Sequence, residues 1–299
     1  MKNRIVFSLS LLAFTLALAS CANLSHINTF ATVSVDALSS KNAIGYSFEQ
    51  SCREFDCQLK SSAPIYYYPT KNEMGTAFGN PPACNCDSFK NADKTLSTIN
   101  AVLTAYLTGL ADLSDGKAVN YNYNDLVSAI NKNEATFKLS DVEVTALGKV
   151  ATIVSNDLMN TYRRNKLKTI VAKADTPFQF IMAAYIRGMG YFKNIVLKND
   201  QDYLVNWYSD YLVKNDATLS PMEKARIFQD YKAQKAKIVA YQALVDNYIA
   251  ALKTIQAGHA ELVKNAAALS VANAKEVINA YSADIFSLIS EFKQLKSKQ

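Results

Sequence analysis

The sequence predicts an all-α protein: an elongated antiparallel bundle of about six or seven helices, with a small disulfide-tied loop region near the N-terminus. Three observations support this. Hydrophobic residues recur every three or four positions over most of the chain, which is typical of helices that bury one face. Helix-breaking residues are scarce, with 9 Gly and 6 Pro in 299 residues, and four of the prolines lie between Pro64 and Pro82. All five cysteines lie at or before Cys86.

The first residues have the pattern of an export signal. Lys2 and Arg4 give a short positive start, and an uncharged, mostly apolar run from Ile5 to Leu18 follows. That run is shorter than the roughly 20 residues that a membrane-spanning helix needs. It therefore favours a signal peptide over residues 1–20, which is removed on export.

A cysteine follows the predicted cleavage point. The run Leu18-Ala19-Ser20-Cys21 has small residues before the cysteine and resembles the lipobox of bacterial lipoproteins. The resemblance implies that Cys21 carries acyl chains and that residues 21–26 form a lipidated tether, which anchors the helical domain 27–299 to a membrane. Ala22, in place of Asp, implies sorting to the outer membrane of a Gram-negative cell, facing the periplasm. The alternative is an ordinary signal peptide followed by an accidental cysteine.

The four remaining cysteines are expected to form two disulfides, because an even number outside the cytoplasm is typical of a disulfide framework. Direct pairing of Cys84 with Cys86 would close a strained ring, so the two cysteine-containing segments are expected to be linked to each other, with the pairing left open. A metal site with four cysteine ligands is the alternative, but zinc sites usually have Cys-x₂-Cys spacing, which is absent here. The four residues are Cys52, Cys57, Cys84 and Cys86.

The domain is predicted to begin with a helix followed by a loop. Residues 27–55 carry apolar residues at helical spacing, although Val33 and Val35 would also suit a strand. Residues 58–89 contain the cluster of prolines and are predicted to be a Cys/Pro-rich loop insertion.

Three adjacent tyrosines in this loop are expected to be exposed and to form a contact surface, because tyrosine suits recognition surfaces. This candidate surface consists of Tyr66, Tyr67 and Tyr68.

Two helices are predicted between this loop and residue 132. The first begins near Asn91 and ends at Ser114-Asp115-Gly116, because glycine is the usual residue just after a helix. A short helix is predicted at 124–132. The buried stripe of the first helix consists of Leu96, Ile99, Leu103, Tyr106, Leu110 and Leu113.

The middle of the chain is predicted to form two further helices. Ser140 and Glu143 have the spacing of a capping box, which predicts a helix from Ser140 to about Lys173. Asp175-Thr176-Pro177 is expected to end this helix and begin another, because proline suits the first helical turn. The stripe of that next helix consists of Phe178, Met182, Tyr185, Met189, Phe192 and Val196. It is expected to continue, with a kink near Asn199-Asp200, through Tyr203, Trp207 and Tyr211.

Ser220-Pro221-Met222-Glu223 is the strongest helix start in the chain, with Ser at the N-cap, Pro at the first position and Glu at the third. The helix continues to about Ala268, so its length is on the order of 70 Å. Its apolar residues step by three and four, like a coiled-coil seam. This seam consists of Ile238, Tyr241, Val245, Tyr248, Leu252, Ile255, His259, Leu262 and Ala266. A last helix, capped by Asn273 and Glu276, is expected to bury Val277, Tyr281, Ile285, Leu288 and Phe292.

The sequence favours a non-enzymatic protein. Its two histidines are His26, in the expected tether, and His259, on the seam of the longest helix. His259 is expected to pack its ring while one nitrogen reaches solvent; the alternative is a buried pH switch or ligand contact. No catalytic triad, metalloprotease, P-loop or dinucleotide motif is present, so no catalytic residue, cofactor or metal is predicted. The net charge of +6 is mild and spread along the chain, which argues against a nucleic-acid partner.

These observations favour a membrane-anchored envelope lipoprotein that binds another protein as an adaptor, an assembly factor or a toxin neutraliser. The helical body is similar to uncharacterised helical lipoproteins of Gram-negative bacteria, and this resemblance implies no activity and no site residues. Two alternatives stay open. One is an enzyme that acts on envelope glycans or lipids through carboxylates. The other is a helical pore-forming or membrane-remodelling protein, which the uncharged segment from Thr95 to Ala111 prompts.

Overall fold

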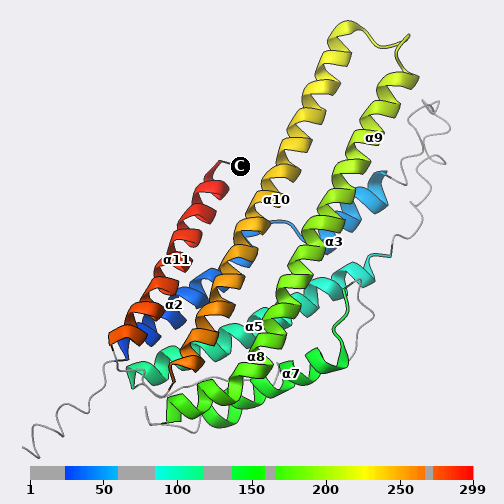
Figure 1. Ribbon diagram of the computed structural model, residues 1–299. Helices are drawn as coiled ribbons and strands as arrows, with labels where there is room; N and C mark the ends of the chain where they lie inside the picture. The colour runs from blue at the N-terminus through cyan, green and yellow to red at the C-terminus, as the bar shows by residue number, and fades with distance from the viewer. Residues whose placement is uncertain (1–23, 60–84, 117–136, 159–165, 267–271, 299) are drawn as a thin grey trace, which may run out of the picture.

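The computed structural model describes residues 24–59, 85–116, 137–158, 166–266 and 272–298, with side chains for all of these except 56–59. This part of the chain consists of α-helices with short 3₁₀ and π turns and contains no strand, which confirms the predicted all-α bundle (Figure 1). The predicted helix at 124–132 lies outside the described residues. In chain order, the elements are α2 (Ser25–Ser39), η1 (Ser40–Ile44), α3 (Phe48–Ser51), η2 (Cys52–Leu59), α5 (Asp87–Asp115), α7 (Asp141–Thr152), η3 (Ile153–Leu158), α8 (Leu167–Tyr191), η5 (Phe192–Leu197), α9 (Lys198–Lys214), α10 (Pro221–Lys264) and α11 (Ala272–Ser297).

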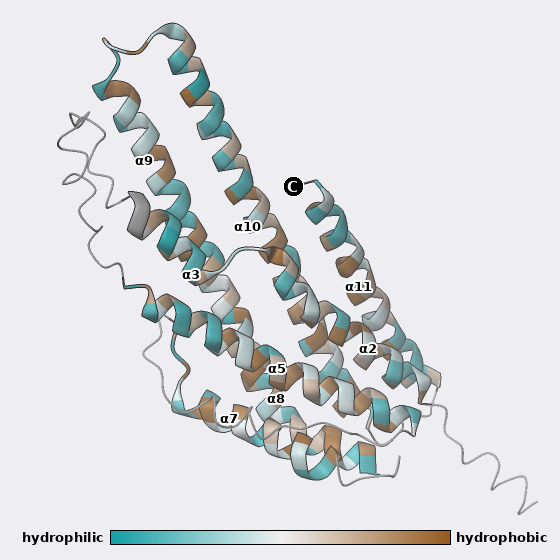
Figure 2. Ribbon diagram, turned by 180° about the vertical axis from the view of Figure 1, so that it is seen from behind, coloured by the Kyte–Doolittle hydropathy of each residue, from teal (hydrophilic) through white to brown (hydrophobic). Residues whose placement is uncertain are grey.

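The helices form a packed body from which one hairpin projects (Figures 1 and 2). In the body, α2 packs against α5 and α11, α10 packs against α8 and α11, and α7 packs against α8. The hairpin, called the arm below, comprises residues 203–237 and contains most of α9 and the first part of α10. Leu204 and Tyr208 are its only buried residues, and the whole of the arm is described. The predicted seam of α10, which starts at Ile238, is buried over its whole length, because it begins where the helix enters the body.

Both predicted capping boxes are present. The Ser140 hydroxyl accepts the Glu143 N–H at 3.4 Å, and Glu143 Oε2 accepts the Ser140 N–H at 2.8 Å. At the start of α10, the equivalent distances between Ser220 and Glu223 are 3.3 and 2.8 Å. At the end of α5, Gly116 has a φ of +75°, the left-handed conformation that glycine adopts without a steric penalty. Local sequence signals therefore locate these three helix ends correctly.

The predicted helix break at Pro177 is wrong. Pro177 lies inside α8, which begins at Leu167 and packs back against α7. Proline costs about 3 kcal/mol inside a helix, whereas burial stabilises by about 1.5–3 kcal/mol for each large apolar side chain. Val171 and Phe178 belong to one buried stripe that continues on both sides of the proline. A single helix keeps this stripe intact, which outweighs the cost of the proline.

The predicted stripe of α9 is shifted by one residue, whereas that of α11 is confirmed at Ile285 and Phe292 and shifted by one residue elsewhere. In α9 the buried side chains are Asp200, Leu204 and Tyr208, whereas Tyr203 is 37% exposed. The π turn η5 precedes α9, and its wider turn rotates the face that follows. The irregularity thus lies slightly before the predicted kink. α11 already includes the predicted cap Asn273, and it buries Ile278 where Val277 was expected.

The first described helix begins earlier than predicted. α2 starts at Ser25, and His26, which was expected in a lipidated tether, is 3% exposed. α5 likewise starts at Asp87, inside the predicted loop insertion.

A disulfide joins Cys52 to Cys86, across 34 positions of sequence. It confirms that the two cysteine-containing segments are linked to each other.

Gly188 of α8 lies close to a side chain of α5. A Cβ added there would lie 2.6 Å from Leu96 Cδ2, nearer than real Cβ contacts come. Gly190, two residues later in α8, has no such neighbour within 4 Å. The absence of a side chain at Gly188 therefore leaves the space that Leu96 of α5 occupies.

Candidate functional site

The structure describes only part of the predicted site residues. Cys21 and Tyr66–Tyr68 lie outside the described residues, as do the side chains of Cys57 and Cys84. Within the described parts of the chain, no group of three or more His, Cys, Asp or Glu residues is placed to hold a metal ion. No helix among those the structure describes is long and apolar enough to cross a membrane.

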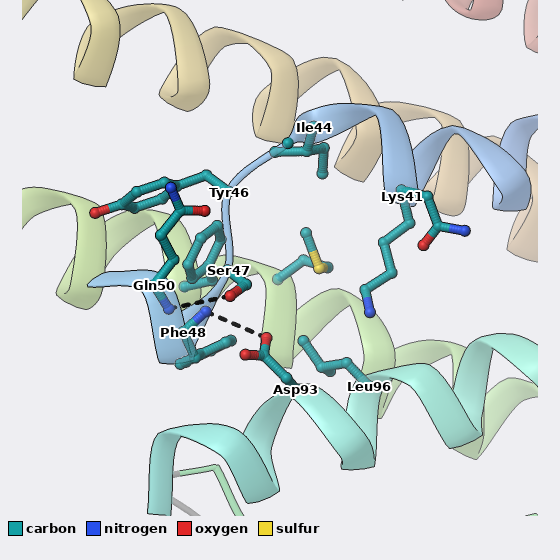
Figure 3. Close-up of a pocket in the computed structure, with 12 residues that line it drawn as sticks. Lys41, Ile44, Tyr46, Ser47, Phe48, Gln50, Asp93 and Leu96 are labelled. Carbon is teal, nitrogen blue, oxygen red and sulfur yellow. Dashed lines mark hydrogen bonds between the residues drawn. The ribbon is translucent and has the colours of Figure 1, made fainter. Parts of the chain in front are cut away.

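A cavity of about 260 Å³ lies between η1, α3 and the first turns of α5 (Figure 3). Figure 3 shows the Lys41 ammonium and the Asp93 carboxylate facing the same open space. The apolar part of the lining comes from several elements, among them η1, α5, α8 and η5, and is buried. It includes Ile44, Leu96, Met189 and Phe192. The site therefore combines two polar groups with an apolar floor, which is the usual composition of a small-molecule pocket.

A tight turn builds the rim of this cavity. Gly45 ends η1 with a φ of +73°, a conformation that favours glycine. Ser47 then caps α3, and its hydroxyl accepts the Gln50 N–H at 3.1 Å. From α5, the two carboxylate oxygens of Asp93 accept the N–H groups of Phe48 at 3.2 Å and Glu49 at 2.9 Å. Asp93 therefore holds the first turn of α3 against α5.

Opposite charges face each other across the cavity. Lys41 Nζ donates to Ser97 Oγ at 3.0 Å, whereas Asp93 accepts from two backbone N–H groups of α3 and from the Ser47 hydroxyl. Burial lowers the pKa of Lys41, and the attraction of Asp93 opposes this shift. Burial likewise raises the pKa of Asp93, and its two backbone donors, the charge of Lys41 and the Ser47 hydroxyl oppose this shift. Both charged forms thus carry a desolvation cost that their present partners offset only in part.

The wall of the cavity is joined to the root of the arm through Tyr46. Its ring stacks on Tyr241 of α10 with centroids 4.7 Å apart, and its hydroxyl donates to Asp200 Oδ2 of α9 at 3.2 Å. Ser51 donates to the other Asp200 oxygen at 2.7 Å. Asp200 is 2% exposed, so these hydroxyls replace water around a buried carboxylate. Burial, together with the charge of Asp200, raises the pKa of Tyr46 far above its usual value.

His259 is fully buried, so the expectation that one of its nitrogens reaches solvent is wrong. Its ring stacks on Phe178 with centroids 4.1 Å apart, and its Nε2 lies 2.8 Å from the Tyr106 hydroxyl. Nδ1 lies 3.3 Å from Asp175 Oδ1, within ion-pair distance but without the alignment of a hydrogen bond. Because a carboxylate can only accept, this geometry favours a proton on Nδ1 and a Tyr106 hydroxyl that donates to Nε2.

The protonation of His259 follows from its surroundings. Burial lowers the pKa of the imidazole, and the nearby Asp175 opposes this shift. The ring is therefore a neutral component of the core. Its complete burial leaves no room for a substrate beside it in this conformation, although the Tyr106–His259–Asp175 order superficially resembles a catalytic triad.

The arm presents apolar and basic side chains to solvent. Met222 is 83% exposed and Val213 is 76% exposed. Lys232 Nζ lies 4.6 Å from the ring centroid of Phe228, an interaction of a cation with the face of an aromatic ring. Residues 224–237 carry five basic side chains and one acidic one. The arm is thus a two-helix surface with apolar groups among positive charges.

Sequence reasoning missed the cavity because its polar residues belong to no motif. Lys41 lies in a 3₁₀ turn and Asp93 on α5, so only the folded chain brings them together. Comparison of the chain with protein-family models, with curated proteins and with solved structures finds no match. The candidate site therefore rests on its geometry and on the chemistry of its own residues.

Proposed function

We propose that this protein is a membrane-anchored envelope lipoprotein that acts non-enzymatically and binds another protein through the arm. The observation that carries the proposal is the exposure of large apolar side chains on a projecting hairpin with almost no core of its own. Apolar groups that cluster on an exposed surface, rimmed by polar residues, are typical of protein interaction sites. The exposed large apolar side chains of the arm include Phe228, Val213 and Met222.

The position of the arm favours a partner that lies away from the anchoring membrane. Leu24 is the first described residue and follows closely after the predicted acylated Cys21. Figures 1 and 2 show the start of α2 and the tip of the arm at opposite ends of the molecule. An anchor at Cys21 would therefore leave the arm extending away from the lipid surface, where it can meet a protein.

The charge of the arm indicates the chemistry of the partner. Lys232, Lys235 and Lys237 lie on the part of α10 that carries Phe228. A protein surface that combines an apolar patch with acidic groups complements this arrangement, and such complementarity raises the association rate and the specificity. An adaptor, an assembly factor or a toxin neutraliser would each use a surface of this kind.

Acylation of Cys21 and a location in the outer membrane, facing the periplasm, belong to the same proposal. The Cys52–Cys86 disulfide supports an oxidising compartment, because structural disulfides are rare in a reducing cytosol. Fractionation of cells that express the natural chain or the Cys21→Ser variant tests the anchor. We expect the natural chain in the outer-membrane fraction and the variant outside it. Identical distributions of the two proteins would contradict the lipid anchor.

Site-specific cross-linking in living cells tests the partner. A photo-reactive amino acid placed at Phe228 is expected to capture one protein, which mass spectrometry identifies. Phe286 provides a matched control, because it is also an exposed phenylalanine, at 65%, but lies on α11 of the body. Capture at Phe228 and not at Phe286 supports the arm as the binding surface. No capture at Phe228, or equal capture of the same protein at both positions, would overturn it.

A charge reversal sharpens the same experiment. Lys232→Glu combined with Lys235→Glu is expected to reduce capture at Phe228, because two positive charges beside the apolar residues become negative. The control is Lys293→Glu combined with Lys298→Glu, on and just beyond the exposed end of α11. Equal losses in both double variants would exclude a specific role for the charge of the arm.

A further inference from the structure

We infer that the cavity between Lys41 and Asp93 binds a zwitterionic small molecule with an apolar side chain, of which an α-amino acid is the simplest example. This site is separate from the surface of the arm, so the inference holds whether or not the arm binds a protein. It rests on three features of the cavity: unused hydrogen-bonding capacity, opposite charges and an apolar floor.

Both charged groups retain bonding capacity toward the open space. The Lys41 ammonium has three N–H donors, of which Ser97 accepts one. The Asp93 carboxylate offers about four acceptor sites, of which the two backbone N–H groups and the Ser47 hydroxyl use three. Both side chains are half-buried, so water solvates them incompletely. A ligand that supplies the missing partners would recover part of the desolvation cost.

The pairing of charges selects a dipolar ligand. A simple carboxylate would be attracted by Lys41 but repelled by Asp93, and a simple amine would meet the reverse. In an α-amino acid the ammonium and the carboxylate are attached to the same carbon, so one small molecule presents a positive and a negative group at once. Such a ligand places its carboxylate toward Lys41 and its ammonium toward Asp93, which satisfies both groups.

The floor and the size of the cavity define the rest of the ligand. The apolar part of the lining includes the buried side chains of Leu96, Met189 and Phe192. Methionine adapts its shape readily, which suits a pocket that accepts several apolar side chains. The volume of about 260 Å³ lies just below the roughly 300–1,000 Å³ typical of pockets for drug-sized ligands. The cavity therefore suits a single amino acid with a leucine-like side chain.

Binding of L-leucine to the full-length protein in detergent, measured by equilibrium dialysis, tests the inference. Two analogues that each lack one charge serve as matched competitors: 4-methylpentanoate, which has no ammonium, and 3-methylbutan-1-amine, which has no carboxylate. We expect saturable binding of L-leucine, with competition by L-methionine and with little competition by either analogue. Absence of binding by L-leucine, L-methionine and L-phenylalanine would overturn the inference, as would equal binding of either single-charge analogue.

Variants locate the site. Lys41→Met and Asp93→Asn are each expected to weaken L-leucine binding at least about tenfold, because each removes a charged hydrogen-bond partner. Lys94→Met is the control, because Lys94 is the exposed neighbour of Asp93 on α5 and does not line the cavity. Asp93 also holds α3, so a melting curve accompanies Asp93→Asn, and Lys41→Met decides the result if that variant unfolds. Unchanged affinity in Lys41→Met would place any bound leucine elsewhere and refute the assignment.

Discussion

The body and the arm each contain a helix that begins with the same hydrogen-bond pattern. Ser140 and Glu143 start α7 in the body, and Ser220 and Glu223 start α10 at the tip of the arm, with nearly equal distances. Glu143, however, is 7% exposed and also pairs with Arg187 at 2.6 Å, whereas Glu223 is exposed. The body therefore supports its local signals with tertiary contacts. The arm has fewer such contacts, chiefly Tyr208, which packs near Tyr231 and donates to Asp230, so it relies more on helix propensity and capping, which by themselves give only marginal stability.

The largest expected difference concerns side chains of similar size in the two regions. Leu252→Ala, at a site with 0% exposure in the body, is expected to lower the free energy of unfolding by about 2–5 kcal/mol, because it leaves a cavity. Met222→Ala in the arm is expected to change it by less than about 0.5 kcal/mol. Urea unfolding followed by circular dichroism measures both values. Equal effects would show that the arm has a packed core after all.

A pair of glycines tests the packing of the body alone. Gly188→Ala is expected to destabilise by about 1–3 kcal/mol, because the new methyl group overlaps Leu96. Gly190→Ala has free space and is expected to be neutral or to stabilise by up to about 1 kcal/mol, since alanine is the better helix former. Thermal unfolding of the two variants provides the comparison. The opposite order would mean that α8 and α5 do not approach closely at Gly188.

Acidification should weaken the body and spare the arm. The pKa of His259 in the folded protein lies below the usual value of about 6.5, so the unfolded chain binds more protons between those two values. The free energy of unfolding is therefore expected to fall as the pH drops below about 6.5, with a slope of up to about 1.4 kcal/mol per pH unit from this residue. The stabilising effect of the neutral ring is fully present above that pH.

The difference between two proteins isolates this effect. His259→Gln is expected to show a smaller pH slope than the natural chain in urea unfolding between pH 7.5 and 5.5, and both proteins keep His26. Trp207, the only tryptophan, lies in the arm, and its fluorescence reports that region separately. Identical slopes in the two proteins would mean that His259 does not titrate differently in the folded and unfolded states.

The smallest effects are expected at the two N-caps. Loss of the capping hydroxyl costs about 1 kcal/mol of helix stability. Ser140→Ala should therefore lower the global free energy of unfolding by about that amount, because α7 unfolds with the body. Ser220→Ala should leave the global value unchanged and accelerate amide hydrogen exchange only in the first turns of α10. A global loss in Ser220→Ala would show that the arm unfolds together with the body.

Local sequence patterns predicted the fold more reliably than they predicted contacts. The end of α5 and the starts of α7 and α10 were located because the residues that define them are adjacent in the chain. Pro177 misled the prediction, since the burial of a continuous stripe outweighs a local preference. The free arm was not foreseen, because Ile227 and Tyr231 have the same spacing as residues of a buried seam. What distinguishes them is the lack of a third helix beside them, which only the tertiary structure reveals.

The candidate site was beyond sequence reasoning for a related reason. A lysine in a short polar turn and an aspartate on an amphipathic helix are ordinary surface residues until the fold places them around one cavity. The histidine of the seam was found from its spacing, but its full burial was not, because Tyr106 and Asp175 come from other helices. Periodicity identifies the face of a helix, whereas partners between helices depend on how those faces meet.

The arm also has a mechanical consequence. The part of α10 that extends from Ile238 to Pro221 is about 26 Å long, so a rotation of about 5° at its root displaces the tip by about 2 Å. Tyr46 lies at that root, in contact with Tyr241 and Asp200, and its other side faces the cavity. Tyr46 therefore connects the lining of the cavity with the residues at the root of the arm. A small rotation of α10 near Tyr46 would therefore move the tip of the arm by a distance that matters for shape complementarity with a partner.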